Sequence, residues 1–420
     1  MADSHPQSSL SKWLVDPVQP TRDAAERAYR FVGDRRAWVV PLGLGIALLT
    51  ISVLGLWQSP ADFYFAYLAG WSFLVTTSLG GLFFLMFNHL TRAHWSVVVN
   101  RINEALVWAF PLLFLLGLPL LFGMHDLYHW THAELYDPNS PKYDEVLAGK
   151  RAYLNVEFWS VRMVVYFAVW TLISYRLYTF SLRQDVDPDP SLQQKMRNTS
   201  AWGLPLLAVT TAFASYDILM STDPHWFSTI FGIYFFAGGI LSAVAAITFL
   251  TLTLQHTGGL LQNVVTPEHY HDLGKYLFGF VVFWAYIAFS QYMLYWYGGI
   301  PEETVWFQHR LRAGWGWHSA FLVLFHFLVP FLVLLPQATK RAYPVLGGMA
   351  VWLIGMHWFD LHWVVVPVLR DSAGFHWLDF TCWLGLTGVF VGGLVYRLSR
   401  HSLVPQNHPS LAESLHFENT

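Results

Sequence analysis

Ionisable side chains occur inside long apolar stretches of this sequence, where they are costly and therefore informative. Asp217 and His326 have apolar neighbours on both sides, and His357 and Asp360 stand within another apolar stretch. A charge at the centre of a membrane-spanning helix costs about 2.5–3.5 kcal/mol on insertion scales, so such a group needs a partner or a purpose. Carboxylates and imidazoles can pass protons along a hydrated half-path. Structural hydrogen bonding is the alternative role for all four residues.

The spacing of these residues limits what they can do together. His357 and Asp360 are three residues apart and therefore share one face of a helix. His362 lies five residues after His357, roughly 140° further round, so a straight helix cannot bring both histidines to one ion. Asp379 and His318 are expected at the level of the lipid headgroups.

Other ionisable residues lie nearer the ends of apolar stretches. Glu157 and Arg162 stand toward one side of the predicted membrane, where they either join the half-path or form an ion pair with each other. His89 and Glu104 stand toward the opposite side, at the predicted end of the second stretch and the predicted start of the third.

The cysteine and histidine patterns argue against a redox cofactor held by this chain. Its single cysteine, Cys382, excludes an internal disulfide, a Cys-rich metal site, a ligated iron–sulfur cluster and a CxxCH haem attachment. Two stacked haems need His pairs about 13–14 residues apart on two facing helices. His318 and His326 are only eight apart, and no second helix repeats a suitable pair. We therefore expect this chain to bind neither haem nor metal.

The composition requires that helices in a membrane position these side chains. Hydrophobic residues make up 55% of the 420 residues and charged residues only 12%, against about 25% charged in soluble domains. A hydrocarbon core of about 30 Å needs roughly 20 apolar helical residues. Ten stretches meet this requirement, at about Ala37–Trp57, Phe63–Leu90, Glu104–Phe122, Glu157–Phe180, Ala201–Met220, Ser228–Leu254, Gly274–Tyr297, Gly316–Pro336, Val345–Val366 and Trp377–Tyr396.

The distribution of Lys and Arg predicts the orientation of these helices. With the N-terminus inside, the inside segments carry 15 of the 24 Lys and Arg residues and the outside segments carry six. We therefore predict a membrane domain over 37–396, with two cytoplasmic, polar and loosely ordered tails, 1–36 and 397–420. The outside loops, 123–156 and 298–315, are long enough to serve as lids or as docking surfaces for an external partner. The net charge of −3 gives no reason to expect a nucleic-acid partner.

Four stretches together carry a resemblance to a known family. They are KRAYLNVEFWSVRMVVYF (150–167), SYDILMSTDPHWFSTIFGIYFFAGG (215–239), FSQYMLYWYGGIPEETVW (289–306) and HFLVPFLVLLPQATKR (326–341). The chain resembles the ActF subunits of bacterial alternative complex III, which belong to the NrfD-like (polysulfide-reductase-C-like) membrane family. The resemblance covers nearly all of 37–396, and its most specific part is DPHWFSTIFGIYFFAG.

The resemblance implies an all-α fold of two four-helix bundles, formed by helices two to five (about 63–220) and six to nine (about 228–366). The first and tenth helices would be peripheral. It also implies a respiratory complex in the bacterial inner membrane that oxidises quinol and reduces periplasmic cytochrome c or a terminal oxidase. The partners would be a multihaem cytochrome c, an iron–sulfur protein and a sister NrfD-like subunit. Haem c and the iron–sulfur clusters would be held by partner subunits and not by this chain.

Carried over to this sequence, the resemblance implies a structural or proton-path role without a catalytic residue of its own. The proton-path candidates on the outer side are Asp217, His326, His357, Asp360, Arg162 and Glu157, and those on the inner side are Glu104 and His89.

Two other functions are alternatives to this one. The chain could bind quinol itself, with His357 and Asp360 as hydrogen-bonding groups and Trp352 and Trp358 as the apolar walls. A secondary transporter is the second alternative, since such proteins contain paired broken helices at the membrane midplane. The prolines that interrupt predicted helices here are Pro111, Pro119, Pro205 and Pro330, without an evident symmetric pair.

Overall fold

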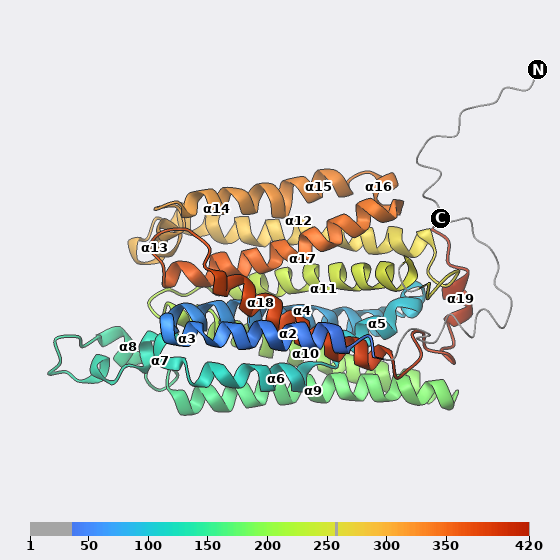
Figure 1. Cartoon of the computed structure of the whole chain (residues 1–420), viewed down its shortest axis with the longest axis horizontal. Coiled ribbons are helices and arrows are strands. Elements are labelled where there is room, and N and C mark those ends of the chain that lie inside the picture. The colour runs from blue at the N-terminus through green and yellow to red at the C-terminus, as the bar shows by residue number, and fades with distance from the viewer. Residues whose placement is uncertain (1–35, 257–258, 420) are drawn as a thin grey trace, which may run out of the picture.

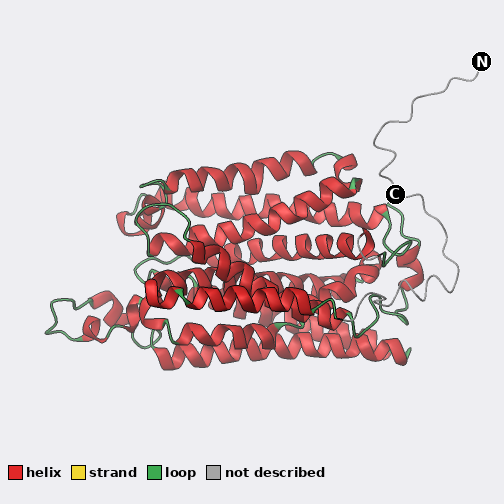
Figure 2. Ribbon diagram, in the orientation of Figure 1, coloured by secondary structure: helices red, strands yellow, loops and turns green. Residues whose placement is uncertain are grey.

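The chain folds as an all-α membrane protein. The computed structural model describes residues 36–256 and 259–419, and this part contains no β-strand (Figure 2). Ten helical segments of the described part are long and apolar enough to cross a membrane, and they lie side by side along one direction (Figure 1). Helices suit a bilayer because all their backbone hydrogen bonds are made within the segment. The predicted fold class is therefore confirmed.

Eight of these segments form two bundles of four. The first bundle contains α4 (Pro60–Thr91), the broken third segment η2–α5–α6–η3 (His94–Ser96, Val97–Val107, Phe110–Gly117, Leu118–Leu121), α9 (Val156–Val186) and α10 (Ser191–Ile218). The second contains α11 (Phe231–His256), α12 (Pro267–Gly298), the eighth segment α14–η7–α15 (Trp315–Leu322, Val323–Leu328, Val329–Leu334) and α17 (Tyr343–Val365). At the periphery, α2 (Val39–Val53) and α3 (Gly55–Gln58) lead into α4, and α2 packs on α18 (Trp377–Leu398), which itself contacts α4.

The two bundles meet where α4 crosses α11. A Cβ atom on Gly80 would collide with the backbone of Gly239, and one on Gly239 would collide with the backbone of Thr76. Only glycine permits this approach of the two helices, and small residues at helix interfaces are the usual packing device in lipid. The glycines on α4 and α11 therefore join the bundles.

Three helices begin earlier than their hydropathy predicts. The third segment begins at His94 instead of Glu104, α10 begins at Ser191 instead of Ala201, and α12 begins at Pro267 instead of Gly274. A hydropathy window detects only the apolar part of a helix, whereas these helices continue through polar residues. The prediction that Glu104 opens the third helix is thus wrong, because Glu104 lies inside α5 and is 1% exposed.

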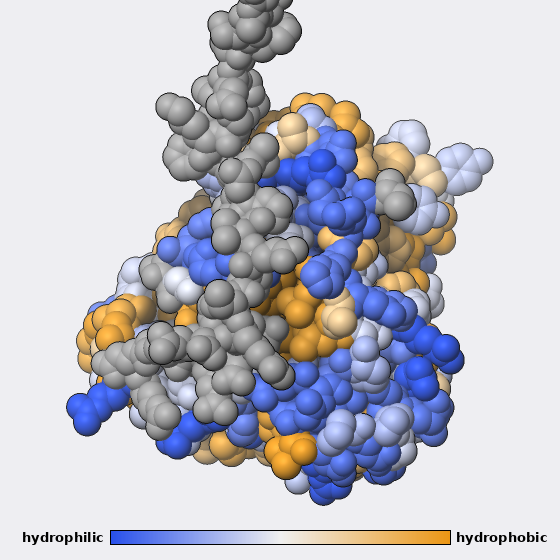
Figure 3. All heavy atoms as spheres, turned by 90° about the vertical axis from the view of Figure 1, so that its right-hand side faces the viewer, coloured by the Kyte–Doolittle hydropathy of each residue, from blue (hydrophilic) through white to orange (hydrophobic). Residues whose placement is uncertain are grey.

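The two ends of the bundle differ. One end, called here the loop end, carries the protruding segment with α7 (Met124–Leu127) and α8 (Glu145–Lys150), together with α13 (Pro301–His309) (Figure 1). The opposite end, called the terminal end, carries both ends of the described chain, and the rings of Trp38 and Tyr396 are in contact there. Hydrophilic side chains cover much of the terminal end (Figure 3).

The C-terminal segment is part of this terminal end, so the expectation of a loosely ordered tail over 397–420 is wrong. Leu403 and Val404 are fully buried, and α19 (Leu411–Leu415) packs on α5. Apolar residues spaced among the polar ones provide this anchoring, and they are too few to register as a hydrophobic stretch. Apart from Arg36, the predicted N-terminal tail lies outside the described residues.

Candidate functional site

A buried carboxylate is the centre of a polar group in the second bundle. Asp360 on α17 accepts a hydrogen bond from the Tyr234 hydroxyl of α11 and one of 3.0 Å from the indole N–H of Trp284 of α12. Asp360 is 1% exposed, and no Lys or Arg of the described residues forms an ion pair with it. We refer to this group as the Asp360 cluster; its members are Thr76, Tyr234, Trp284, His326, His357 and Asp360.

His326 joins the cluster from an irregular turn of the eighth segment. Its ring stacks on that of Trp284, with 4.0 Å between the ring centroids. It lies in the π-helical turn η7, and such turns occur frequently at functional sites. His326 is 0% exposed, and within the described part neither ring nitrogen has a hydrogen-bond partner.

His357 extends the cluster to the first bundle. Its Nε2 lies 2.8 Å from the Thr76 hydroxyl of α4, while its Nδ1 has no partner among the described residues. A Cβ on Gly238 would lie 2.7 Å from His357 Cε1 and 3.6 Å from Asp360 Oδ2. Both side chains therefore face α11, which confirms that they share one face of α17.

The residue types of this cluster are ones that can exchange protons and form hydrogen bonds. The cluster contains an imidazole with two free nitrogens, a second imidazole with one, and a carboxylate fixed by two donors, and these groups come from α11, α12, the eighth segment and α17. A buried polar atom without a partner calls for an explanation, and a role in proton transfer is one. No group of three His, Cys, Asp or Glu in the described ranges is placed to hold a metal ion.

A second buried charge pair occupies the first bundle toward the loop end. Arg162 of α9 donates to both carboxylate oxygens of Asp217 of α10, at 2.8 and 2.9 Å, and Tyr166 donates to the same carboxylate at 2.8 Å. The Arg162 guanidinium also lies 3.9 Å from the Tyr153 ring centroid. The ion pair considered between Glu157 and Arg162 is wrong: Glu157 is exposed in the first turn of α9, and Arg162 is held by Asp217.

The inner-side candidates lie apart from the Asp360 cluster. Glu104 is 3.4 Å from the guanidinium of Arg101, which also binds both oxygens of Asp185 at 3.0 and 2.9 Å. His89 is buried at the end of α4, and no hydrogen bond of the described residues links it to Glu104. The described residues thus show no direct interaction between His89 and Glu104.

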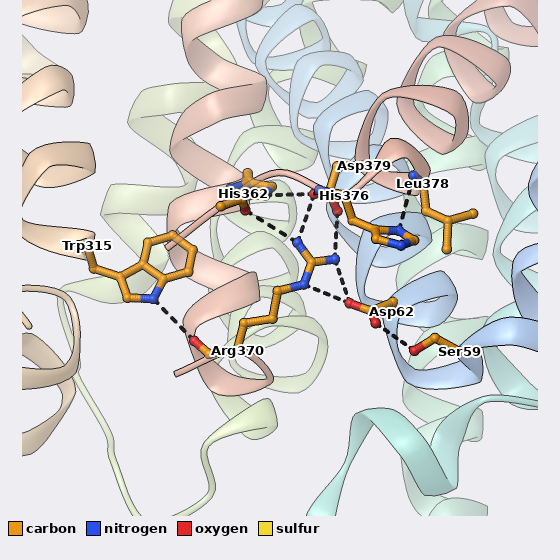
Figure 4. Close-up of polar contacts among 9 residues, drawn as sticks. Ser59, Asp62, Trp315, His362, Arg370, His376, Leu378 and Asp379 are labelled. Carbon is orange, nitrogen blue, oxygen red and sulfur yellow. Dashed lines mark hydrogen bonds and ion pairs between the residues drawn. The ribbon is translucent and has the colours of Figure 1, made fainter. Parts of the chain in front are cut away.

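A third charge network lies at the loop end beside the peripheral helices (Figure 4). Arg370 binds Asp62 at 2.7 Å and Asp379 at 2.9 Å, and His362 lies 3.3 Å from the same Asp379 carboxylate. Asp379 stands in the first turn of α18 at the loop end and is 1% exposed, because its partners enclose the acid. The network ties α18 to α4 and α17 and has a structural role.

None of the four residues named for a quinol site lines the large apolar cavity of the second bundle. The Trp352 indole donates to the Phe325 carbonyl at 2.7 Å, and Trp358 stacks on Trp383 with 4.4 Å between ring centroids. Neither indole donates a hydrogen bond to Asp360, whose donors are Tyr234 and Trp284. The cavity has a volume of about 700 Å³ and lies between α12 and α14.

The sequence interpretation missed the aromatic donors that hold Asp360 and Asp217, and the cation that holds Asp379. Tyr234, Trp284 and Tyr166 count as ordinary aromatic residues of apolar helices, and Arg370 counts as a loop cation. A buried Tyr or Trp usually needs a partner for its O–H or N–H group, and this is the signal that marks such residues. Their partners come from other helices, so no spacing within one stretch reveals them.

Comparison with known proteins assigns no role to these groups. No protein-family model matches the chain, and no curated protein matches it. Interpretation of the site depends on its geometry and on the motifs quoted above.

Proposed function

We propose that this chain is a membrane subunit of a quinol-oxidising respiratory complex of the alternative complex III type, and that it conducts protons through the Asp360 cluster. It holds no electron carrier in this proposal. The four motif stretches support the assignment to the complex. The observation that carries the proton role is the cluster itself, in which Asp360 and His326 lie fully buried between membrane-spanning helices.

The path that we propose runs from the loop end toward the cluster. The Arg162–Asp217 pair is the outer charged group, and Glu157 stands exposed near it at the start of α9. Glu104 and His89 are its counterparts toward the terminal end. Electron transfer in a neighbouring subunit would shift the populations of proton-accessible states of the cluster, which is how a redox step couples to proton movement without a cofactor here.

The topology in this proposal places the loop end in the periplasm of a bacterial inner membrane and both termini in the cytoplasm. The protruding segment around α7 and α8 and the segment around α13 then provide docking surfaces for the multihaem cytochrome c and the iron–sulfur protein. The sister NrfD-like subunit and, in some complexes, a terminal oxidase are the membrane partners.

The transporter alternative gains no support. Among the described residues of the two bundles, the third and eighth segments are the ones interrupted in mid-span, whereas Pro205 lies inside the continuous helix α10. The third segment is the second member of its bundle and the eighth is the third member of the other, so the two breaks are not equivalent. The paired arrangement of transporters therefore does not apply.

The test of the proton role uses the purified complex in proteoliposomes. Asp360→Asn keeps an acceptor for Tyr234 or Trp284 but cannot ionise, and His326→Ala removes the imidazole. We expect both variants to lose proton translocation while quinol oxidation continues. Asp371→Asn, an exposed acid near the loop end, is the matched control and should leave the proton-to-electron ratio unchanged.

Two results would overturn the proposal separately. An unchanged proton-to-electron ratio in both Asp360→Asn and His326→Ala rejects the proton path. Isolation of the native complex followed by mass spectrometry and haem staining tests the assignment to the complex, which fails when no multihaem or iron–sulfur protein copurifies.

A further inference from the structure

A large apolar cavity opens between α12 and the eighth segment, and its lining includes Tyr234 and Trp284 of the Asp360 cluster. Its volume is about 700 Å³, within the range of sites that enclose a ligand, about 300–1,000 Å³. Its lining is almost entirely aromatic and aliphatic, and the exposed side chains of Tyr286, Phe289 and Val323 stand at its rim. In a membrane these residues face lipid, so the cavity opens sideways into the bilayer.

One cation lies at the loop end of this cavity. The guanidinium of Arg310, 2% exposed, donates to the backbone carbonyls of Trp363 at 3.2 Å, Trp306 at 2.9 Å and Val364 at 2.5 Å. It lies 3.3 Å from the Trp306 ring centroid. Carbonyls and a ring face fix the position of the group but do not neutralise it.

The charge of Arg310 lacks a partner within the described part of the chain. No carboxylate there approaches within 4.0 Å, and Asp223 acts on it only from beyond contact. Burial lowers the pKa of Arg310 to about 9, so the group remains a cation at neutral pH. Three of its five N–H donors are used by the carbonyls, which leaves two for a ligand. A buried cation without a counter-charge is costly, so an anion at this place is strongly favoured.

A second unpartnered polar group lies deeper in the same cavity. Gln291 is 3% exposed and lines the cavity from α12, and its Oε1 has no partner among the described residues. Gln291 lies seven residues before Gly298, the last residue of α12. The distance from Gln291 to that end, measured along the helix axis, is roughly 10 Å. Arg310 binds carbonyls near the end of α17, so it lies at headgroup level with Gln291 beneath it.

We propose that this cavity binds an anionic phospholipid, whose phosphate is held by the Arg310 guanidinium and whose glycerol ester and acyl chain occupy the cavity past Gln291. A guanidinium offers paired N–H donors that match phosphate oxygens. Basic pockets between transmembrane helices bind lipid headgroups in this way. The lipid would act as a wedge that closes the gap between α12 and α14.

The depth of the charge favours a phospholipid over a quinone. A neutral quinone ring does not compensate the charge of Arg310. The cation lies at headgroup level and the apolar space extends from it toward Trp284, which is 14 residues from the end of α12. A charged head above an apolar chain fits this order. The cavity shares Tyr234 and Trp284 with the Asp360 cluster, but the two polar groups that carry this inference, Arg310 and Gln291, belong to neither that cluster nor the Arg162–Asp217 pair.

The experiment measures the melting temperature of the full chain, purified in detergent and stripped of lipid, during titration with phosphatidylglycerol. We expect saturable stabilisation by phosphatidylglycerol but none by diacylglycerol with the same chains or by inorganic phosphate. Arg310→Gln should weaken the apparent affinity by about tenfold or more, because it removes charge-assisted hydrogen bonds. Arg312→Gln removes an exposed cation two residues away and is the matched control.

A second pair of variants keeps the test decisive if Arg310→Gln does not fold. Ala288→Phe fills the cavity without touching the carbonyls that hold Arg310, and it should abolish the stabilisation; Leu294→Phe, on the exposed face of α12 and outside the cavity, should not. Equal stabilisation by diacylglycerol, an effect of inorganic phosphate alone, or full stabilisation of Ala288→Phe would overturn the proposal. Competition by a short-chain quinone at the same concentration as phosphatidylglycerol would identify the cavity as a quinone site instead.

Discussion

At the scale of single residues, the charges inside this protein are held by partners from other helices. Arg162 and Asp217 form two parallel hydrogen bonds, and both are buried. The attraction within a buried pair must offset the cost of removing both charges from water, so the pair itself adds little net stability. Removal of one partner is far more costly, because the other charge then remains buried and alone.

This asymmetry predicts the effect of Arg162→Gln. The variant leaves the Asp217 carboxylate with Tyr166 but without its cation, and we expect it to destabilise the fold by about 3–5 kcal/mol. Arg162→Leu combined with Asp217→Asn removes both charges and should regain most of that loss. Unfolding of the detergent-solubilised chain by denaturant measures both. A single variant as stable as the wild type would show that the pair is solvated in the native membrane protein.

At the scale of elements, the C-terminal segment shows how a polar stretch becomes part of the fold. Ser414 donates to the Trp95 carbonyl at 3.0 Å, Gln406 N–H donates to Asp185 at 3.0 Å, and His94 pairs with Glu413. These contacts join 399–419 to the start of the third membrane segment and to the end of α9. The segment thus covers the terminal end, next to the inner-side candidate Glu104.

One histidine gives this segment a dependence on pH. Burial, together with the nearby His94, lowers the pKa of His408 from 6.5 to about 4, and its Nδ1 accepts a hydrogen bond from the Ser410 N–H. Between pH 6.5 and about pH 4, His408 is protonated when 399–419 is undocked but neutral when the segment is docked. Docking of the segment therefore weakens as the pH falls from about 6.5 toward 4. We expect the amides of residues 403–416 to exchange several-fold faster at pH 5 than at pH 7.5, after correction for intrinsic rates.

Amide hydrogen exchange of the His408→Asn variant is the control for this prediction. The Asn oxygen can accept the same hydrogen bond from Ser410 but does not titrate, so the variant should show protection that is independent of pH. If the wild type and His408→Asn respond equally to acid, another group controls the docking of 399–419.

At the scale of the whole molecule, the closest backbone contact between the bundles holds the Asp360 cluster together. Gly80 and Gly239 let α4 approach α11, and this approach places Thr76 of the first bundle against His357 of the second. The cluster is thus shared between bundles, and its geometry depends on a contact made by residues without side chains.

Gly80→Ala is therefore expected to destabilise the protein more than a glycine change elsewhere. Its Cβ would meet backbone atoms of Gly239, which cannot rotate away, so the cost should lie at or above the upper end of the usual 1–3 kcal/mol for overpacking. Gly279→Ala on α12 is the matched control, because nothing lies within 4 Å of its Cβ. Melting temperatures in detergent should fall for Gly80→Ala and stay level or rise for Gly279→Ala. Equal melting temperatures would mean that α4 and α11 separate without cost.

The sequence by itself determined the all-α membrane fold with ten helices able to cross a membrane, and the placement of both ends of the described chain at one end of the bundle. Each of these depends on a local property, the summed hydropathy of about 20 consecutive residues, and an even number of crossings returns the chain to its starting side. His357 and Asp360 were likewise predicted to share a face, since helix geometry fixes the direction of residues three apart.

Only the tertiary structure decided which polar groups meet. Arg162 forms its ion pair with Asp217 of another helix and not with Glu157 of its own helix. Asp360 accepts hydrogen bonds from Tyr234 and Trp284, which lie on two further helices. Hydropathy carries no information about how each helix is rotated or which helix stands beside it. Close packing at glycines and the matching of side-chain shapes set those choices, and they arise only when the helices assemble.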